Sequence, residues 1–410
     1  MNAIENQVLV IGAGIVGSTQ ALALGKAGLN VTLIDRDDPS SKLTESFDGR
    51  TSAIALANKR ALENLGVWQH LEDKCAPILD IRISEKGSPI HLHYDHREVG
   101  DEPLGYIIQN SDLRFALFKE IRANKNIINL APEEVVKTDR SEFFAQATLS
   151  DNSKITASLI IAADGKNSPI RKEAKIRVTK WKYNQTAIVF AIKHQYPHCF
   201  IAHEHFLPSG PLAILPIKNK SAPFQNMSSV VWTEKSRISP ILMSLPKKAF
   251  ETELMSVLGD TLGKIEVVGS REAYPLGLQF AENFTSTRLA LIGDAIHSIH
   301  PIAGQGLNMG LRDVSALSET VINAQKLGLD IGDYNTLSNY QKWRRFDNTV
   351  MIASTDSLNR LFSNDFMPLK IARNIGLASI SKIPVLKRFF MRHAMGLTGE
   401  IPHLMRIRSI

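Results

Sequence analysis

Cysteine is scarce in this 410-residue sequence, which contains only Cys75 and Cys199. Two cysteines so far apart exclude a disulfide framework and the paired spacing of a zinc site, and they are typical of a protein in a reducing cytoplasm. The sequence also lacks an apolar run long enough to cross a bilayer, so we predict no transmembrane helix. The N-terminus has no basic leader and enters a strand-like run at Gln7, so no cleaved signal peptide is expected.

Acidic residues are almost missing from the C-terminal segment 366–410, where Glu400 stands against eight lysines and arginines. This segment accounts for the whole net charge of +7, so the rest of the chain is neutral. A basic surface spread over the body is therefore excluded, and we expect no nucleic-acid partner. Phe389, Phe390 and Met391 lie among the basic residues, a pattern typical of peripheral docking on an anionic membrane. A C-terminal helix with one face packed on the body is the alternative.

The N-terminal segment 7–37 reads as strand, glycine turn, helix and strand. Gly12, Gly14 and Gly17 form the pattern G-x-G-x-x-G, and Asp35 ends the second strand. In this context the glycines permit a tight turn, the approach of a pyrophosphate and close helix packing. The helix N-terminus attracts phosphate, and the acid accepts hydrogen bonds from ribose hydroxyls. The motif by itself leaves NAD and FAD open.

Two later strand-like runs end in the same kind of residue. The run beginning at residue 157 ends at Asp164-Gly165, and the run "RLALIGDA" ends at Gly293-Asp294. A helix start at Gly304-Gln305-Gly306 follows. A simple nicotinamide dehydrogenase needs only the first motif, so the additional strand ends favour FAD.

The histidines are the only candidates for a metal site. His297 and His300 have helical spacing, but no cluster of carboxylates or cysteines joins them, so no metal is predicted. The stretch "HLHYDH" is more typical of a solvated hairpin. The histidines at 194, 198, 203 and 205 include candidates for contact with a phenol, although most are typical of ordinary strand or surface positions.

The three motifs together resemble those of the flavoprotein aromatic hydroxylases built like para-hydroxybenzoate hydroxylase. That superfamily has an N-terminal G-x-G-x-x-G, a central D-G and a C-terminal G-D motif, and all three stand here in order over nearly the whole chain. Within the superfamily, segments 48–68, 300–313 and 395–406 are most similar to the ubiquinone-biosynthesis hydroxylases.

The resemblance implies roles for single residues. Pro301 would form a wall near the reactive flavin face, and the N–H groups at 304–308 would stabilise negative charge on the pyrimidine edge of reduced flavin. The implied catalytic environment is Pro301, Gly304 and Gln305, without an identified general base. The implied FAD-binding residues are Gly12, Ala13, Gly14, Gly17, Asp35, Arg36, Arg50, Gln109, Asp164, Gly293, Asp294, Gly304, Gly306, Leu307 and Asn308.

The expected fold class is α/β, or α+β in two domains: a Rossmann-like FAD-binding domain, a mainly antiparallel β-sheet substrate domain and a helical C-terminal segment. Alternating stretches such as "TAIVFAIKH" indicate the antiparallel sheet. The expected limits are 1–75, 101–180 and 271–345 for the discontinuous FAD domain, 76–100 and 181–270 for the substrate domain, and 346–410 for the helical region.

The implied activity is FAD-dependent hydroxylation of the aromatic ring of a polyprenyl phenol in ubiquinone biosynthesis, with NAD(P)H as donor and a C4a-hydroperoxyflavin formed from O2. The resemblance also implies a ubiquinone-biosynthesis complex as partner. The insoluble substrate favours a cytoplasmic protein held peripherally on the inner membrane through 366–410. The alternatives are a same-fold isoprenoid epoxidase or reductase, or a non-catalytic component of a biosynthetic complex. No motif identifies the ring position, the tail length or the direct reductant.

Overall fold

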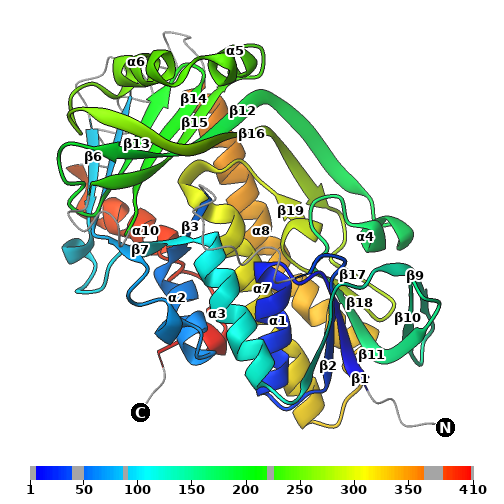
Figure 1. Cartoon of the computed structure of the whole chain (residues 1–410). Coiled ribbons are helices and arrows are strands. Elements are labelled where there is room, and N and C mark those ends of the chain that lie inside the picture. The colour runs from blue at the N-terminus through cyan, green and yellow to red at the C-terminus, as the bar shows by residue number, and fades with distance from the viewer. Residues whose placement is uncertain (1–5, 39–49, 86–90, 219–225, 364–381, 408–410) are drawn as a thin grey trace.

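The computed structural model describes residues 6–38, 50–85, 91–218, 226–363 and 382–407, which form three β-sheets and a set of long helices (Figure 1). The two larger sheets lie at opposite ends of the molecule. Helices α7 (Gln305–Lys326) and α8 (Tyr334–Phe362) run between them.

The first sheet has a parallel core in the order β17-β18-β11-β1-β2-β8, with the antiparallel pair β9 and β10 beside β11. Val8, Leu9 and Val10 of its central strand are fully inaccessible, which confirms a strand buried on both faces. The strands are β1 (Asn6–Ile11), β2 (Val31–Ile34), β8 (Ile127–Leu130), β9 (Val135–Arg140), β10 (Ala145–Leu149), β11 (Lys154–Ala162), β17 (Thr285–Ser286) and β18 (Leu289–Leu291).

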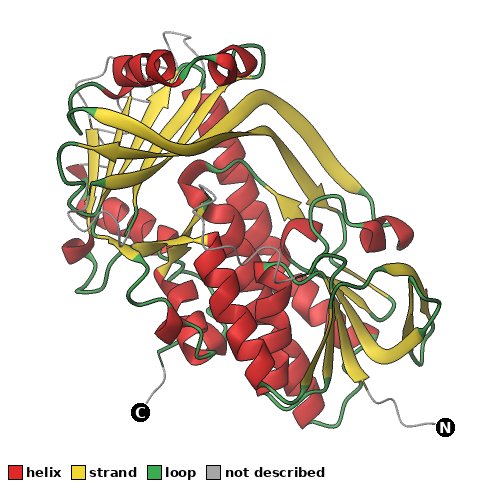
Figure 2. Ribbon diagram, viewed as in Figure 1, coloured by secondary structure: helices red, strands yellow, loops and turns green. Residues whose placement is uncertain are grey.

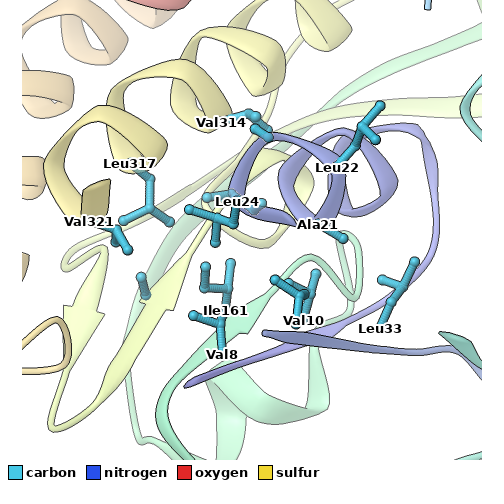
Figure 3. Packing of buried hydrophobic residues seen from close by; sticks show 14 of the residues in the cluster. Val8, Val10, Ala21, Leu22, Leu24, Leu33, Ile161, Val314, Leu317 and Val321 are labelled. Atoms are coloured by element: carbon cyan, nitrogen blue, oxygen red, sulfur yellow. The ribbon is translucent and has the colours of Figure 1, made fainter. Parts of the chain in front are cut away.

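Helices α1 (Ile15–Lys26) and α7 pack with this sheet into one hydrophobic core, with α3 (Asn110–Ala123) beside α1 (Figure 3). Leu24 on α1 and Val314 on α7 both belong to this core and lie above the strands in the view. The two helices approach closely because α7 has a glycine at its contact with Val16. A Cβ added at Gly310 would lie 2.8 Å from the Val16 side chain.

The second sheet is mainly antiparallel, in the order β19-β16-β12-β15-β14-β13-β5-β6 (Figure 2). Helices α5 (Ser239–Ser244) and α6 (Lys247–Leu258) cover one face, where Phe190, Trp232 and Phe250 pack together. The strands are β5 (Asp80–Glu85), β6 (His91–Asp95), β12 (Val178–His194), β13 (Ile201–Leu207), β14 (Gly210–Pro216), β15 (Met227–Lys235), β16 (Ile265–Ala281) and β19 (His297–Ser298).

A small third sheet and the remaining helices connect the two ends. The sheet has the order β3-β7-β4 and is built from β3 (Thr51–Ala55), β4 (Ala76–Ile78) and β7 (Gly105–Gln109). The remaining helices are α2 (Leu56–Asn64), α4 (Pro169–Glu173) and α10 (Pro384–Ala394). The expected fold class is confirmed, because a parallel nucleotide-binding sheet and a mainly antiparallel sheet occur in one mixed α/β chain. The division into domains at the expected limits remains a prediction.

A buried ionic network fixes α7 and α8 to the loop after β18. The Asp313 carboxylate on α7 accepts hydrogen bonds from His297 Nε2 at 2.6 Å, Arg344 Nε at 2.8 Å and the Gly293 N–H at 3.2 Å. Burial alone would raise the pKa of Asp313, but attraction to His297 and Arg344 and their hydrogen bonds lower it to about 2. All three side chains are at most 2% exposed, so each depends on the others for compensation of its charge or polarity.

We expect Asp313→Asn to lower the free energy of unfolding by more than about 2 kcal/mol at neutral pH, because the buried Arg344 would lose one of its two carboxylate partners and keep only Asp347, at 2.8 Å. Asp139→Asn removes a half-exposed ion pair with Lys137 and should cost under about 1 kcal/mol. Urea denaturation of both variants measures the difference. Equal losses in the two variants would contradict a structural role for the network.

Candidate active site

A cavity of about 790 Å³ lies between the first and second sheets. One end is lined mostly by backbone and small side chains, among them Gly14, Gly165, Asp294 and the segment 304–308. These residues follow the carboxyl ends of parallel strands β1, β11 and β18 or begin α7. Ligands of open α/β sheets bind at this edge.

The glycines of the first motif have separate tasks. Gly12 has a φ of +102°, and a Cβ there would lie 2.4 Å from the Ala163 carbonyl oxygen. A Cβ at Gly17 would lie 1.9 Å from the Gly12 carbonyl oxygen. The turn and helix α1 can therefore contact each other only because both positions are glycine. A Cβ at Gly14 would meet nothing within 4 Å, and Gly14 lines the cavity. The space beside Gly14 is therefore open to a ligand.

Asp35 and Arg36 lie outside the lining of the cavity. The Asp35 carboxylate accepts hydrogen bonds from the Ala13 N–H at 2.5 Å and the Asp37 N–H at 2.8 Å, so it holds the glycine turn in place. The Arg36 side chain is largely exposed, with its Nε 3.9 Å from Asp37. Contacts of Asp35 and Arg36 with ribose remain predictions.

Asp164 has an incompletely satisfied carboxyl group and stands between two lining residues, Ala163 and Gly165, without lining the cavity itself. One oxygen accepts a hydrogen bond from the Ile170 N–H at 3.2 Å. The other oxygen is buried and has no partner within the described residues. Burial raises the pKa of Asp164. A buried carboxyl oxygen without a donor is costly, which fits a ligand that donates to it.

The segment 293–308 places a helix N-terminus at the cavity. Gly304 has a φ of +62° and precedes α7, and its added Cβ would lie 2.9 Å from the Ala53 Cβ. A Cβ at Gly306 would meet nothing within 4 Å. Gln305 and Leu307 line the cavity on either side, so the free N–H groups of a 22-residue helix begin there. Burial raises the pKa of the nearby Asp294.

The Asn308 side chain is fully engaged within the protein. Its Oδ1 accepts hydrogen bonds from the Ala55 N–H at 2.9 Å and Asn58 Nδ2 at 2.8 Å. Its Nδ2 donates to the carbonyl oxygens of Ala53 at 2.9 Å and Gly304 at 3.1 Å. Because an amide has two donor hydrogens and two acceptor lone pairs, Asn308 has its backbone alone to offer a cofactor.

Arg50 directly precedes β3 and Gln109 ends β7, and neither residue lines the cavity. The Arg50 guanidinium lies 5.5 Å from the centre of the Tyr274 ring, and Gln109 pairs with Thr51 across the strands. The lining side chains here are Ser52 and Asn110, joined by a 2.6 Å hydrogen bond. The sequence offered no motif for either residue. The segment 39–49 before Arg50 lies outside the described residues.

The histidines are dispersed, and the described part of the chain contains no cluster of histidine, cysteine and carboxylate able to hold a metal. His297 is bound to Asp313. His300 is fully buried with its ring 5.3 Å from the Tyr183 ring, and burial lowers its pKa to about 4. Of the histidines at 194, 198, 203 and 205, His203 alone lines the cavity.

The other end of the cavity is mostly apolar, and its individual lining residues were not predicted from the sequence. Strands β5, β6, β13, β14 and β15 contribute one face of the second sheet, and α8 and α10 contribute Phe362 and Met391 opposite it. The sheet residues are Ile81, Ile83, Leu92, Tyr94, Ala202, Glu204, Phe206, Ala213, Leu215 and Val231. The period-two alternation was visible in the sequence, but the pairing of β5 with β13 was not.

Comparison with known proteins identifies the class. Residues 5–340 match the family described as FAD binding domain, and the chain belongs to that family. It is 45% identical over 402 residues to ubiquinone hydroxylase UbiL of Rhodospirillum rubrum, a match that covers 97% of this chain and 92% of that protein. It is 32% identical over 393 residues to 3-demethoxyubiquinol 3-hydroxylase of Escherichia coli, a match that covers 95% and 98% of the two chains.

The fold has a solved counterpart in p-nitrophenol 4-monooxygenase PnpA of Pseudomonas putida DLL-E4. The TM-score is 0.78 at 18% identity, with 96% of this chain and 98% of that chain covered. The expected FAD-binding family is confirmed, and FAD is the cofactor. The residues present fit it: open space beside Gly14 and Gly306, an unpaired buried oxygen on Asp164 and the α7 N-terminus face one cavity end or its border.

We expect Gly14→Ala to leave folding almost unchanged but to reduce retention of FAD at least about tenfold, because the added methyl group would occupy open space beside the turn. Its φ of −64° and ψ of 177° suit alanine. Gly17→Ala should instead lower the melting temperature, since its methyl group would meet backbone. Flavin absorbance per mole of protein and thermal unfolding test the pair. Full flavin content in Gly14→Ala would refute this placement of the pyrophosphate.

Proposed function

We propose that the protein is a flavin-dependent monooxygenase that hydroxylates the aromatic ring of a polyprenyl phenol in ubiquinone biosynthesis. The observation that carries this function is a single cavity with two kinds of lining. Glycine-rich turns and a helix N-terminus form one end, while aliphatic and aromatic side chains from the second sheet, α8 and α10 form the other. A flavin fits the first end and a ring with an isoprenoid tail fits the second. The names of UbiL and of the Escherichia coli relative agree with this substrate class.

The residues at the flavin end position groups and exclude water. The N–H groups at the start of α7 line the cavity and would hold the flavin, and with the helix dipole they would stabilise negative charge on its ring. Pro301 lines the cavity as a rigid wall beside them. FAD supplies the redox and oxygen chemistry when bound. NAD(P)H is the proposed donor.

The test is anaerobic titration of the yellow protein with NADPH and NADH, followed by aerobic turnover with a prenylated phenol such as 2-geranylphenol. We expect bleaching of the flavin bands and a product with one added oxygen on the ring, located by fragment masses. Oxygen on the prenyl tail would indicate an epoxidase, and two added hydrogens a reductase. Absence of flavin and of nicotinamide-dependent oxygen uptake would favour a non-catalytic component of a biosynthetic complex.

We also propose that α10 docks on a membrane at the apolar end of the cavity. Its residues Phe390, Met391 and Ala394 line the cavity, whereas Val385 and Phe389 are 71% and 54% exposed. Arg388 and Arg392 are exposed on the same helix. An exposed helix with apolar and basic side chains suits the interface of an anionic bilayer, where an insoluble phenol resides.

None of the helices in the described residues combines the length and apolarity needed to cross a membrane. Residues 366–381 and 408–410 of the expected docking segment lie outside the described residues.

Sedimentation with vesicles of phosphatidylcholine and phosphatidylglycerol tests this docking. We expect Val385→Asp with Phe389→Asp to weaken binding at least about fivefold, since two exposed apolar anchors are lost and two like charges to the lipid are gained. Phe143→Asp is the control, because Phe143 is 80% exposed on the hairpin between β9 and β10. Equal binding of the double variant and the control would show that α10 is not part of the docking surface. Contact with a ubiquinone-biosynthesis complex on the inner membrane is part of the same proposal.

A further inference from the structure

Glu204 interrupts an otherwise apolar face of the second sheet. Along β13, Ala202, His203, Glu204 and Phe206 line the cavity, and Ala202, Glu204 and Phe206 share one face of the strand. The neighbours of Glu204 across the sheet are Ala213 on β14 and Ile83 on β5. A carboxyl group on this face therefore stands among alkyl and aromatic side chains, where its charged form is poorly solvated.

The described residues offer Glu204 no partner. No hydrogen bond or ion pair is formed by its side chain, and desolvation is the sole cause that raises its pKa to about 7. Within the described parts of the chain, no lysine or arginine lines the cavity. The other titratable side chains facing this space are Tyr94 on β6, His203 next to Glu204 and Asp294 at the flavin end. Arg82 on β5 is the register partner of His203, and it does not line the cavity.

An unpaired carboxyl group in an apolar pocket costs stability and is a functional signal when it faces a ligand space. The substrate proposed above has a long apolar tail and a ring with oxygen substituents. Aliphatic walls suit the tail, so Glu204 is the group on the sheet face that can pair with a ring hydroxyl. The other polar side chains of the second sheet that line the cavity are Tyr94, whose pKa burial raises to about 12, His203 and Ser298, and among the described residues of that sheet Glu204 alone brings a carboxyl group to it.

We propose that Glu204 is a catalytic residue that accepts a hydrogen bond from the phenol hydroxyl of the substrate and takes its proton during ring hydroxylation. This inference rests on the proposed function. The phenol O–H bond breaks, its proton passes to a Glu204 carboxylate oxygen, and its electron pair stays on the phenol oxygen and is shared with the ring. A ring carbon then forms a bond with one oxygen atom derived from O2. The O–O bond breaks as this bond forms. The proton on that carbon passes to the second oxygen atom, which restores the aromatic ring, and the proton on Glu204 returns to the phenol oxygen. The nicotinamide donor supplies the two electrons, and a second proton from solvent completes the water in which the second oxygen atom leaves.

Protonation of Glu204 should make turnover depend on pH. The carboxylate is the reactive form, and a pKa near 7 means that Glu204 is protonated below that pH. Turnover should therefore rise as pH increases through about 7. The flavin-reduction step measured without oxygen should not follow the same curve, because it precedes removal of the phenol proton.

The first experiment compares wild type, Glu204→Gln, Glu204→Asp and Glu234→Gln across pH 5.5–9 with 2-geranylphenol, a range of about two pH units on either side of the expected midpoint. Glu234 lies on β15 of the same sheet and does not line the cavity, which makes it a matched control. We expect Glu204→Gln to lower kcat at least about a hundredfold at pH 8 and to abolish the rise near pH 7, with flavin content unchanged. Glu204→Asp should restore part of the rate and the rise, and Glu234→Gln should match wild type.

An unchanged pH profile in Glu204→Gln would overturn the inference while wild-type turnover still supports the proposed function. Failure of wild type to hydroxylate any prenylated phenol would instead overturn the function itself. A second measurement tests the contact even if a Glu204 variant turns over poorly because its structure is disturbed. Binding of 2-geranylphenol and of its methyl ether is followed through the flavin spectrum, and wild type should prefer the phenol at least about tenfold. Loss of that preference in Glu204→Gln supports the contact, and an equal preference in both proteins refutes it.

Discussion

The buried carboxylate of Asp313 is the interaction on which the flavin end of the cavity depends. It joins the Gly293 N–H, the His297 ring and the Arg344 guanidinium, which come from the loop after β18, β19 and α8. One charged group thereby fixes the loop that carries Asp294 relative to the first turns of α7. Because its partners are inaccessible to water, the arrangement has few alternatives that keep the charge compensated. The polar chemistry of the site thus rests on an ion pair that no ligand touches.

Close backbone packing adds a second constraint at the same place. Val16 on α1 occupies the space left by Gly293 and Gly310, while Gly17 lies against the turn at Gly12. The N-termini of α1 and α7 consequently converge on one cavity, and Gly14 and Gly306 leave its surface open. Two positive helix ends that share a water-poor space suit a cofactor with phosphates at one part and a reducible ring at another. The apolar face of the second sheet continues this space toward α10. The cavity therefore offers successive places for the cofactor, the substrate ring and the substrate tail.

Local features of the site were predictable. The strand at 8–11, the turn at 12–17 and the glycine before α7 are all contiguous in sequence, and each depends on a backbone conformation or apolar run that neighbouring residues dictate. The resemblance added FAD and the substrate class. Contacts that depend on side-chain partners could not be predicted from the sequence: Asp35 closes the turn, and the Asn308 amide is used entirely within the protein, where it holds β3 and α2 on the start of α7. His297, considered as a metal ligand, belongs to the Asp313 network instead.

The sequence by itself determined a flavoprotein with a G-x-G-x-x-G turn, two further strand ends and a basic, partly apolar C-terminus, because these signals reside in short segments. Only the tertiary structure decided what surrounds the substrate space. β5 pairs in parallel with β13 more than a hundred residues later, and this register sets which side chains face the cavity. A shift by one residue would turn Ala202, Glu204 and Phe206 to the other face of the sheet, since strand side chains alternate with a period of two. Such long-range register arises from packing over the whole sheet, which no local segment encodes.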